Sequence, residues 1–187
     1  YRMNPPDGAP MHWSRLIELP LALLVILLRP LFGQSVAEMV AGSVVPLLLL
    51  GWITYMLSRI ATRIASREAG VAAALITLSS GALLLQLRPM RIDHHGWQIA
   101  MSVLALSTMF WPNVRKAGLV LGLALSVWLH ISLEGAPMMT AFFLLLGLRW
   151  VRDAGEGERL FWTILSFGLC SFALFFGTQV AAIYATT

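Results

Sequence analysis

Charged residues are scarce in this sequence. Asp, Glu, Lys and Arg make up 12% of its 187 residues, hydrophobic residues make up 58%, and the mean hydropathy is +0.79. Soluble domains carry about 25% charged residues, so the composition excludes an ordinary soluble domain. A net charge of +4 would suggest a nucleic-acid partner in a soluble protein. Here we expect no nucleic acid and assign the basic residues to loops beside a membrane.

Cysteine and the common catalytic motifs are also missing. Cys170 is the only cysteine, which excludes an intrachain disulfide. The sequence contains no GxxxxGK loop, no nucleophile elbow, no CxxC pair and no HExxH motif. Neither the alternating strands of a membrane barrel nor an internal repeat is visible. A helical bundle is therefore expected, because backbone amides in lipid must be paired within each segment.

The sequence does contain long apolar runs that approach the roughly 20 residues needed to cross a membrane. Residues 1–14 form a loop rich in turn formers, and the run over residues 15–32 is interrupted by Glu18 and Pro20. We read that run as an interfacial or re-entrant helix, with a true span as the alternative. Six clearer spans are expected over residues 36–57, 70–87, 97–111, 119–133, 137–151 and 160–184.

These runs predict an all-α, polytopic transmembrane helix bundle that forms one domain over residues 1–187. Residues 1–35 would be an external loop with an interfacial helix, and residues 36–187 would hold about six spans. The chain starts at Tyr1 without an initiator methionine, and its last apolar run reaches Thr187 without a flanking anchor. We therefore expect it to be a fragment of a longer protein.

The basic residues predict the orientation of the bundle. They fall in three loops between the expected spans, and all three loops lie on one face whether residues 15–32 stay on the surface or cross the membrane. Only the side of the N-terminal loop depends on that choice. The positive-inside rule makes that face cytoplasmic. The loops that carry Asp93 and Glu134 then lie on the external, periplasmic face of an inner membrane. The basic residues are Arg59, Arg63 and Arg67, then Arg115 and Lys116, then Arg149, Arg152 and Arg159.

One short polar stretch, residues 88–97, is the only place where an acid and two histidines adjoin. Gly96 follows the histidines, so we expect this stretch to be extended or turned. Alternate side chains of an extended backbone share a face, which puts Asp93 and His95 on one side and His94 on the other. A carboxylate with an imidazole is half a site for a divalent cation. These ligands suit Mn, Zn or Fe, whereas Mg prefers oxygen and water.

Other polar residues lie near this half-site. Arg88 and Arg91 are candidates for binding a phosphate group, or they extend to the interface as charged anchors. Glu134 is a candidate ligand or base on the same outer face, or simply a polar residue at a helix end. We assign His130 to interhelical packing. The alternative for the whole stretch is a solvated loop in which Asp93 and the histidines pair with the arginines.

Two stretches, in their order, carry a resemblance to a known family. Pro6-Asp7-Gly8 lies in the N-terminal loop, and Asp93-His94-His95 follows after a short helix and two spans. This order resembles the catalytic subunits of oligosaccharyltransferases, especially archaeal ones, which are glycosyltransferases of the GT-C type. The resemblance implies that both loops face outward and that Asp93 and His95 bind a divalent metal, Mn or Mg. Glu134 matches no motif of that family.

For function, the resemblance implies transfer of a sugar from a polyprenyl-phosphate-linked donor to an acceptor on the outer face of the membrane. Asp93, His95 and Glu134 are the catalytic candidates, and the metal would stabilise the departing phosphate. Two other classes stay open. One is a transporter in which Asp93, His94 and His95 handle ions or protons, and the other is a structural bundle without activity. We expect the fragment to be inactive alone.

Overall fold

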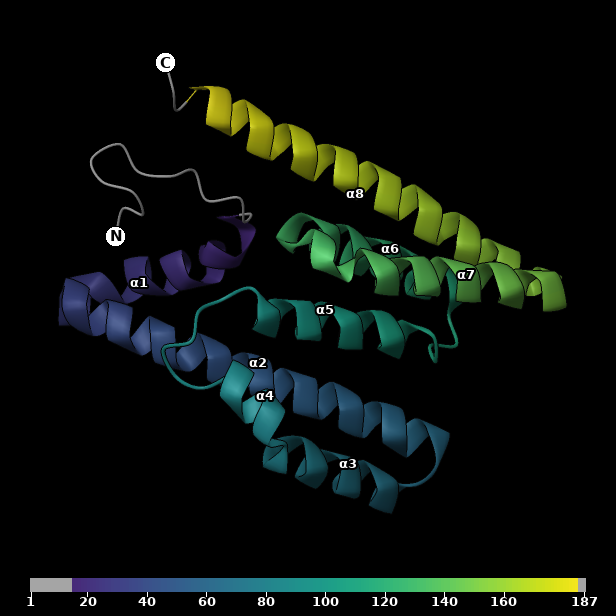
Figure 1. The fold of residues 1–187 in the computed structure, drawn as a ribbon, viewed down its shortest axis with the longest axis horizontal. Helices are drawn as coiled ribbons and strands as arrows, with labels where there is room; N and C mark the ends of the chain where they lie inside the picture. Colours follow the sequence, from purple (N-terminus) through teal and green to yellow (C-terminus); the bar gives the residue numbers. More distant parts are fainter. Residues whose placement is uncertain (1–14, 185–187) are drawn as a thin grey trace.

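The computed structural model describes residues 15–184, and every regular element in this range is helical (Figure 1). The prediction of an all-α chain is confirmed. The loop with Pro6-Asp7-Gly8 lies outside the described residues. The helices are α1 (Glu18–Phe32), α2 (Gln34–Ile64), α3 (Arg67–Ser79), α4 (Gly81–Gln86), α5 (His95–Thr108), α6 (Val114–Ile131), α7 (Ala136–Arg152) and α8 (Gly157–Tyr184), with single 3-10 turns η1 (Arg15–Ile17), η2 (Leu133–Gly135) and η3 (Ala154–Glu156).

Within the part of the chain that the structure describes, three segments are long and apolar enough to cross a membrane: Gln34–Ile64, Val114–Ile131 and Ala154–Gly177. About six spans were expected, and that number is not confirmed. α5 and α7 have 14 and 17 residues, or about 21 and 26 Å of helix, which is less than a hydrocarbon core of about 30 Å.

The expected span over residues 70–87 is broken in the middle. Ser80 has an extended backbone, with φ −70° and ψ 107°, and it separates α3 from α4. The hydroxyl of Ser79 donates to the carbonyl of Ile76 at 3.2 Å. Serine hydroxyls compete for helix carbonyls, and the glycine that follows is a poor helix former. The local sequence Ser79-Ser80-Gly81 therefore explains the break.

The predicted short helix before the first span is present as α1, which folds back beside the first half of α2 (Figure 1). Gly33 makes the turn between them with φ +78° and ψ 168°, a conformation that glycine adopts far more readily than other residues. Much of the apolar surface of α1 stays exposed, which suits contact with lipid. The exposed residues are Leu19, Leu23, Ile26, Leu27, Leu31 and Phe32.

α5 lies in the middle of the bundle and contributes to both buried clusters (Figure 1). Toward its start, Ala100 and Val103 pack with Leu50 and Ile53 of α2. Toward its end, Ala105 joins a cluster built from α6 and α7. Because α5 is held from both sides, its first turn is a rigid place from which to present side chains.

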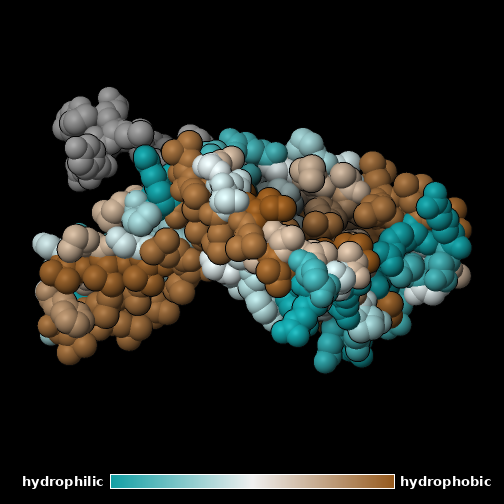
Figure 2. Space-filling view, turned by 90° about the horizontal axis from the view of Figure 1, so that it is seen from below, coloured by the Kyte–Doolittle hydropathy of each residue, from teal (hydrophilic) through white to brown (hydrophobic). Residues whose placement is uncertain are grey.

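The three basic loops meet at one end of the bundle, as predicted. Arg159 donates to the carbonyls of Thr108 and Trp111 at 2.6 and 3.2 Å, and Arg149 donates to that of Met109 at 3.1 Å. Glu156 bridges the two arginines, with 2.8 Å to each. Figure 2 shows hydrophilic residues gathered at one end of the molecule and broad hydrophobic areas at the other. The membrane face that each end meets stays a prediction.

Candidate functional site

The candidate site is built at the beginning of α5, where Asp93 starts the helix. One carboxylate oxygen of Asp93 accepts the backbone N–H of His95 at 3.1 Å, the usual way in which an aspartate turns the chain two residues on. The other oxygen accepts from Nε of Arg91 at 2.6 Å. Arg91 also donates to the carbonyl of Leu85 at 3.4 Å. Asp93 therefore holds both the start of the helix and the preceding loop.

His94 and His95 face the same side, which corrects the sequence prediction. The backbone of His94 is helical, with φ −76° and ψ −17°. The two imidazole rings stack, with 4.2 Å between their centroids and 30° between their planes. The prediction of a turned segment is confirmed by the bends at Asp93 and His94. The prediction that His94 points away from His95 is wrong, because the backbone of His94 is already helical one residue before α5.

Glu134 reaches the two histidines from η2, between α6 and α7. Its Oε2 lies 3.5 Å from Nε2 of His94 and accepts a hydrogen bond from Gln98 at 3.1 Å. The hydroxyl of Ser132 accepts the N–H of Glu134 at 3.2 Å and so starts the 3-10 turn. His94 is buried, His95 half-buried and Glu134 exposed. The prediction that the loops of Asp93 and Glu134 share one end of the bundle is confirmed.

Both carboxylates of the site are tuned toward the ionised form. Burial raises the pKa of Asp93, but hydrogen bonds from Arg91 and from the backbone of His95, together with nearby positive charge, outweigh it and lower the pKa overall. The hydrogen bond from Gln98 and the proximity of His94 lower the pKa of Glu134. Each group therefore carries a negative charge at neutral pH.

His94, His95 and Glu134 could hold a metal ion. One ligand atom from each lies within 4.8 Å of the others. Ligands of a tetrahedral zinc ion with bonds of about 2.0 Å lie about 3.3 Å apart, and the 3.5 Å between Nε2 of His94 and Oε2 of Glu134 is close to that spacing. Asp93 Oδ1 lies 3.5 Å from Nδ1 of His95. A carboxylate in this position orients an imidazole and leaves its Nε2 for the metal.

The sequence-predicted residues are thus partly brought together. The predicted ligand His95 belongs to the group that could hold a metal, and Glu134 joins it. The other predicted ligand, Asp93, is beside His95 but is engaged by Arg91. In this group His94, and not Asp93, is the candidate metal ligand beside His95.

Three further residues complete the comparison with the sequence predictions. Arg88 is exposed on the loop before Asp93. Nδ1 of His130, which was assigned to interhelical packing, lies 2.9 Å from the carbonyl of Ser126 in its own helix. Gln98 was not foreseen. Its position four residues after His94 on one helix was the available signal, because residues i and i+4 share a face.

An apolar groove of about 630 Å³ lies beside the site, between α1, α2 and α5. Trp97 of its wall follows His94 by three residues, a spacing that places two side chains on the same face of a helix. The groove therefore starts at the same turn of α5 that carries the histidines. Its lining is Pro20, Leu23, Leu24, Leu27, Val45, Leu48, Leu49, Trp52, Trp97, Ala100 and Met101.

Comparisons of this chain with protein-family models, with curated proteins and with solved structures give no match. The site combines a group of residues that could hold a metal with a neighbouring apolar groove.

Proposed function

We propose that the protein is a metal-dependent membrane glycosyltransferase of the GT-C type, which moves a sugar from a polyprenyl-phosphate-linked donor to an acceptor. The observation that supports this is the apolar groove beside His94, His95 and Glu134. The groove has the chemistry to accept isoprenoid units, and the polar cluster at its end meets the phosphate. Such a donor needs both an apolar channel and a positive centre.

The residues of the cluster have separable tasks in this proposal. His94, His95 and Glu134 would hold the metal ion, which would supply positive charge to stabilise the departing phosphate. Two imidazoles and one carboxylate favour Zn, Mn or Fe over Mg, which prefers oxygen ligands. The exposed guanidinium of Arg88 binds the phosphate oxygens. Asp93 orients His95 and holds the side chain of Arg91 beside the cluster.

The first test is metal binding to the purified protein in detergent, measured by calorimetry with Zn²⁺ and Mn²⁺. We expect one ion per chain, and about a 100-fold or greater loss of affinity in His94→Ala and Glu134→Gln. His130→Ala is the matched control, because this histidine lies in α6 outside the cluster. Unchanged affinity in both cluster variants would reject the metal site.

The second test is sugar transfer by the same preparations from a radiolabelled polyprenyl-phosphate donor in the presence of membrane extract as acceptor source. Activity should be lost on chelation and restored by the metal that binds. Metal binding without transfer in the full-length protein would reject the transferase and keep the metal site.

A transporter is the second candidate. The ionisable residue that a transporter would need is buried His94. However, the cluster lies at the beginning of α5 and beyond the end of α6, whereas transporter sites favour the membrane midplane and broken helices. Proton flux in proteoliposomes that His94→Ala abolishes would favour this candidate over the enzyme.

A further inference from the structure

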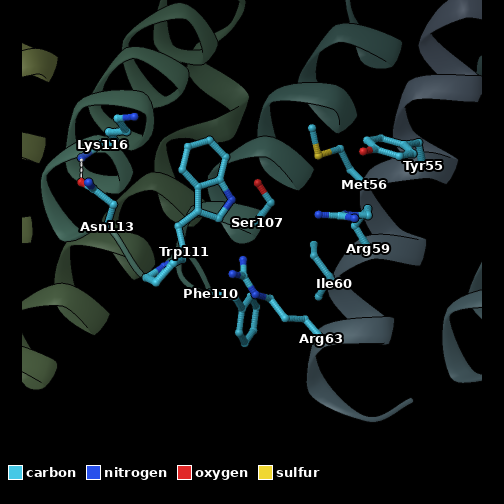
Figure 3. Close-up of a pocket in the computed structure, with 11 residues that line it drawn as sticks. Tyr55, Met56, Arg59, Ile60, Arg63, Ser107, Phe110, Trp111, Asn113 and Lys116 are labelled. Carbon is cyan, nitrogen blue, oxygen red and sulfur yellow. Dashed lines mark hydrogen bonds between the residues drawn. The ribbon is translucent and has the colours of Figure 1, made fainter. Parts of the chain in front are cut away.

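A second cleft, of about 340 Å³, lies at the opposite, basic end of the bundle (Figure 3). Arg59 and Arg63 extend from α2 toward Trp111 and Phe110, and Lys116 lies on α6 beyond Trp111. The lining contains three cations and no acid. The cleft is therefore positively charged and suits an anionic ligand.

These cations differ from the other basic residues at the same end. Arg149 and Arg159 are used inside the fold, because each bonds Glu156 and a backbone carbonyl. Arg59, Arg63 and Lys116 are exposed, and no ion pair within residues 16–177 involves any of them. The only recorded aromatic contact of Arg59 in this range is a weak one, 6.0 Å from the Tyr55 ring. Their charges are left for a ligand.

The backbone around the cleft adds to the positive potential. α6 begins at Val114, so the positive end of its dipole points toward the cleft that Asn113 lines. The opposing negative end of α5 is neutralised, because its last carbonyls accept from Arg149 and Arg159. Positive charge therefore dominates the electrostatic potential in the cleft.

Apart from Ser107 and Asn113, the rest of the lining is apolar or aromatic. Met56, Ile60 and Phe110 contribute apolar surface to the cleft. Tyr55 and Trp111 also line it, and tyrosine and tryptophan are enriched where a membrane meets water. A volume of about 340 Å³ is at the small end of ligand sites. It suits a headgroup whose apolar tail continues along the outside of the bundle.

We propose that this cleft binds the phosphate-bearing headgroup of an anionic phospholipid. Guanidinium groups pair with phosphate oxygens in a bidentate manner, and Arg59 and Arg63 lie one helical turn apart on α2, so both reach one headgroup. Basic pockets between membrane helices on the cytoplasmic side are suited to this ligand. The site lies at the opposite end from His94, His95 and Glu134 and does not depend on their function.

The test uses the full-length protein in nanodiscs of phosphatidylcholine, with phosphatidylglycerol added in steps and bound lipid counted by native mass spectrometry. Arg59→Gln combined with Arg63→Gln should weaken phosphatidylglycerol binding about 10- to 30-fold, at roughly fivefold per cation. The matched control, Arg67→Gln with Arg152→Gln, removes the same charge from exposed positions at the same end outside the cleft. It should change binding less than twofold.

Three outcomes decide the proposal. Selective loss in the cleft variant, with metal binding at the other end intact, supports it. Equal loss in both double variants would show a general surface charge effect and overturn it. Binding of inorganic phosphate or an oligonucleotide to the cleft, without binding of phosphatidylglycerol, would also overturn the proposal. The ligand would then come from solution and not from the membrane.

Discussion

The backbone N–H of Met90 donates to the carbonyl oxygen of Gly42 at 2.8 Å. In a regular helix that carbonyl would accept from residue 46, but residue 46 is proline and has no N–H. Pro46 thus leaves the carbonyl of Gly42, in the first half of α2, without a helical donor, and the loop before Asp93 uses this acceptor. Met90 has φ +67°, a left-handed conformation that is strained for a side chain other than glycine. The hydrogen bond helps to hold that conformation.

Replacing the proline should loosen the loop. Pro46→Ala restores an N–H that competes for the carbonyl of Gly42, so the bond to Met90 should weaken by about 1 kcal/mol. We expect amide exchange at Met90 to become about fivefold faster, measured by hydrogen exchange with mass spectrometry. Pro30→Ala in α1 is the control, since it also restores a helical N–H. Equal exchange at Met90 in wild type and Pro46→Ala would contradict the tether.

The pKa of Asp93 should depend on Arg91. Because the folded pKa lies below the unfolded value of about 3.9, ionised Asp93 stabilises the fold above that pH, and the stabilisation is lost as the pH falls through the lowered pKa. Arg91→Gln removes the principal charge that lowers it, so the pKa should rise.

Carbon NMR of protein labelled at aspartate Cγ measures this titration directly. The sequence has only three aspartates, Asp7, Asp93 and Asp153, so the Asp93 signal can be assigned with Asp93→Asn. Arg88→Gln is the control, because Arg88 is not among the groups that lower the pKa. A midpoint for Asp93 that does not move in Arg91→Gln would rule out the ion pair as the cause.

Asp93 and the histidines should respond differently in metal titrations. In our proposal Asp93 positions His95 through its contact with Nδ1 at 3.5 Å, so Asp93→Asn should weaken the affinity for Zn²⁺ by about 10- to 100-fold. His95→Ala removes a ligand and should cost more. If Asp93→Asn abolished binding while Glu134→Gln left it unchanged, Asp93 would be the ligand in place of Glu134.

Two glycines set the packing of α6 on α8. A Cβ at Gly122 would overlap the backbone carbonyl of Thr163, and one at Gly118 would lie 2.6 Å from that of Arg159. Backbone cannot move as a side chain does, so Gly122→Ala should destabilise the fold by about 1–3 kcal/mol. Gly168→Ala in α8 has open space and serves as control. Thermal unfolding in detergent should show a lower midpoint for Gly122→Ala alone.

The sequence alone was sufficient for features that depend on local composition. Apolar runs predicted helices, and the interrupted run at Glu18 and Pro20 predicted the short α1. The spacing of basic loops between apolar runs predicted that Arg149, Arg159 and Lys116 would lie at one end and Glu134 at the other. The spacing Gly118-x-x-x-Gly122 was an unused signal of close helix packing.

The cluster of possible metal ligands was decided by tertiary structure. The choice of His94 depended on where α5 begins, which a hydrogen bond to Asp93 fixes and a period-two pattern cannot show. The approach of Glu134 depended on how α6 packs against α5, and that is set by contacts between residues about 40 positions apart. Apolar length predicts that helices exist, but the shape of their packed side chains decides which polar residues meet.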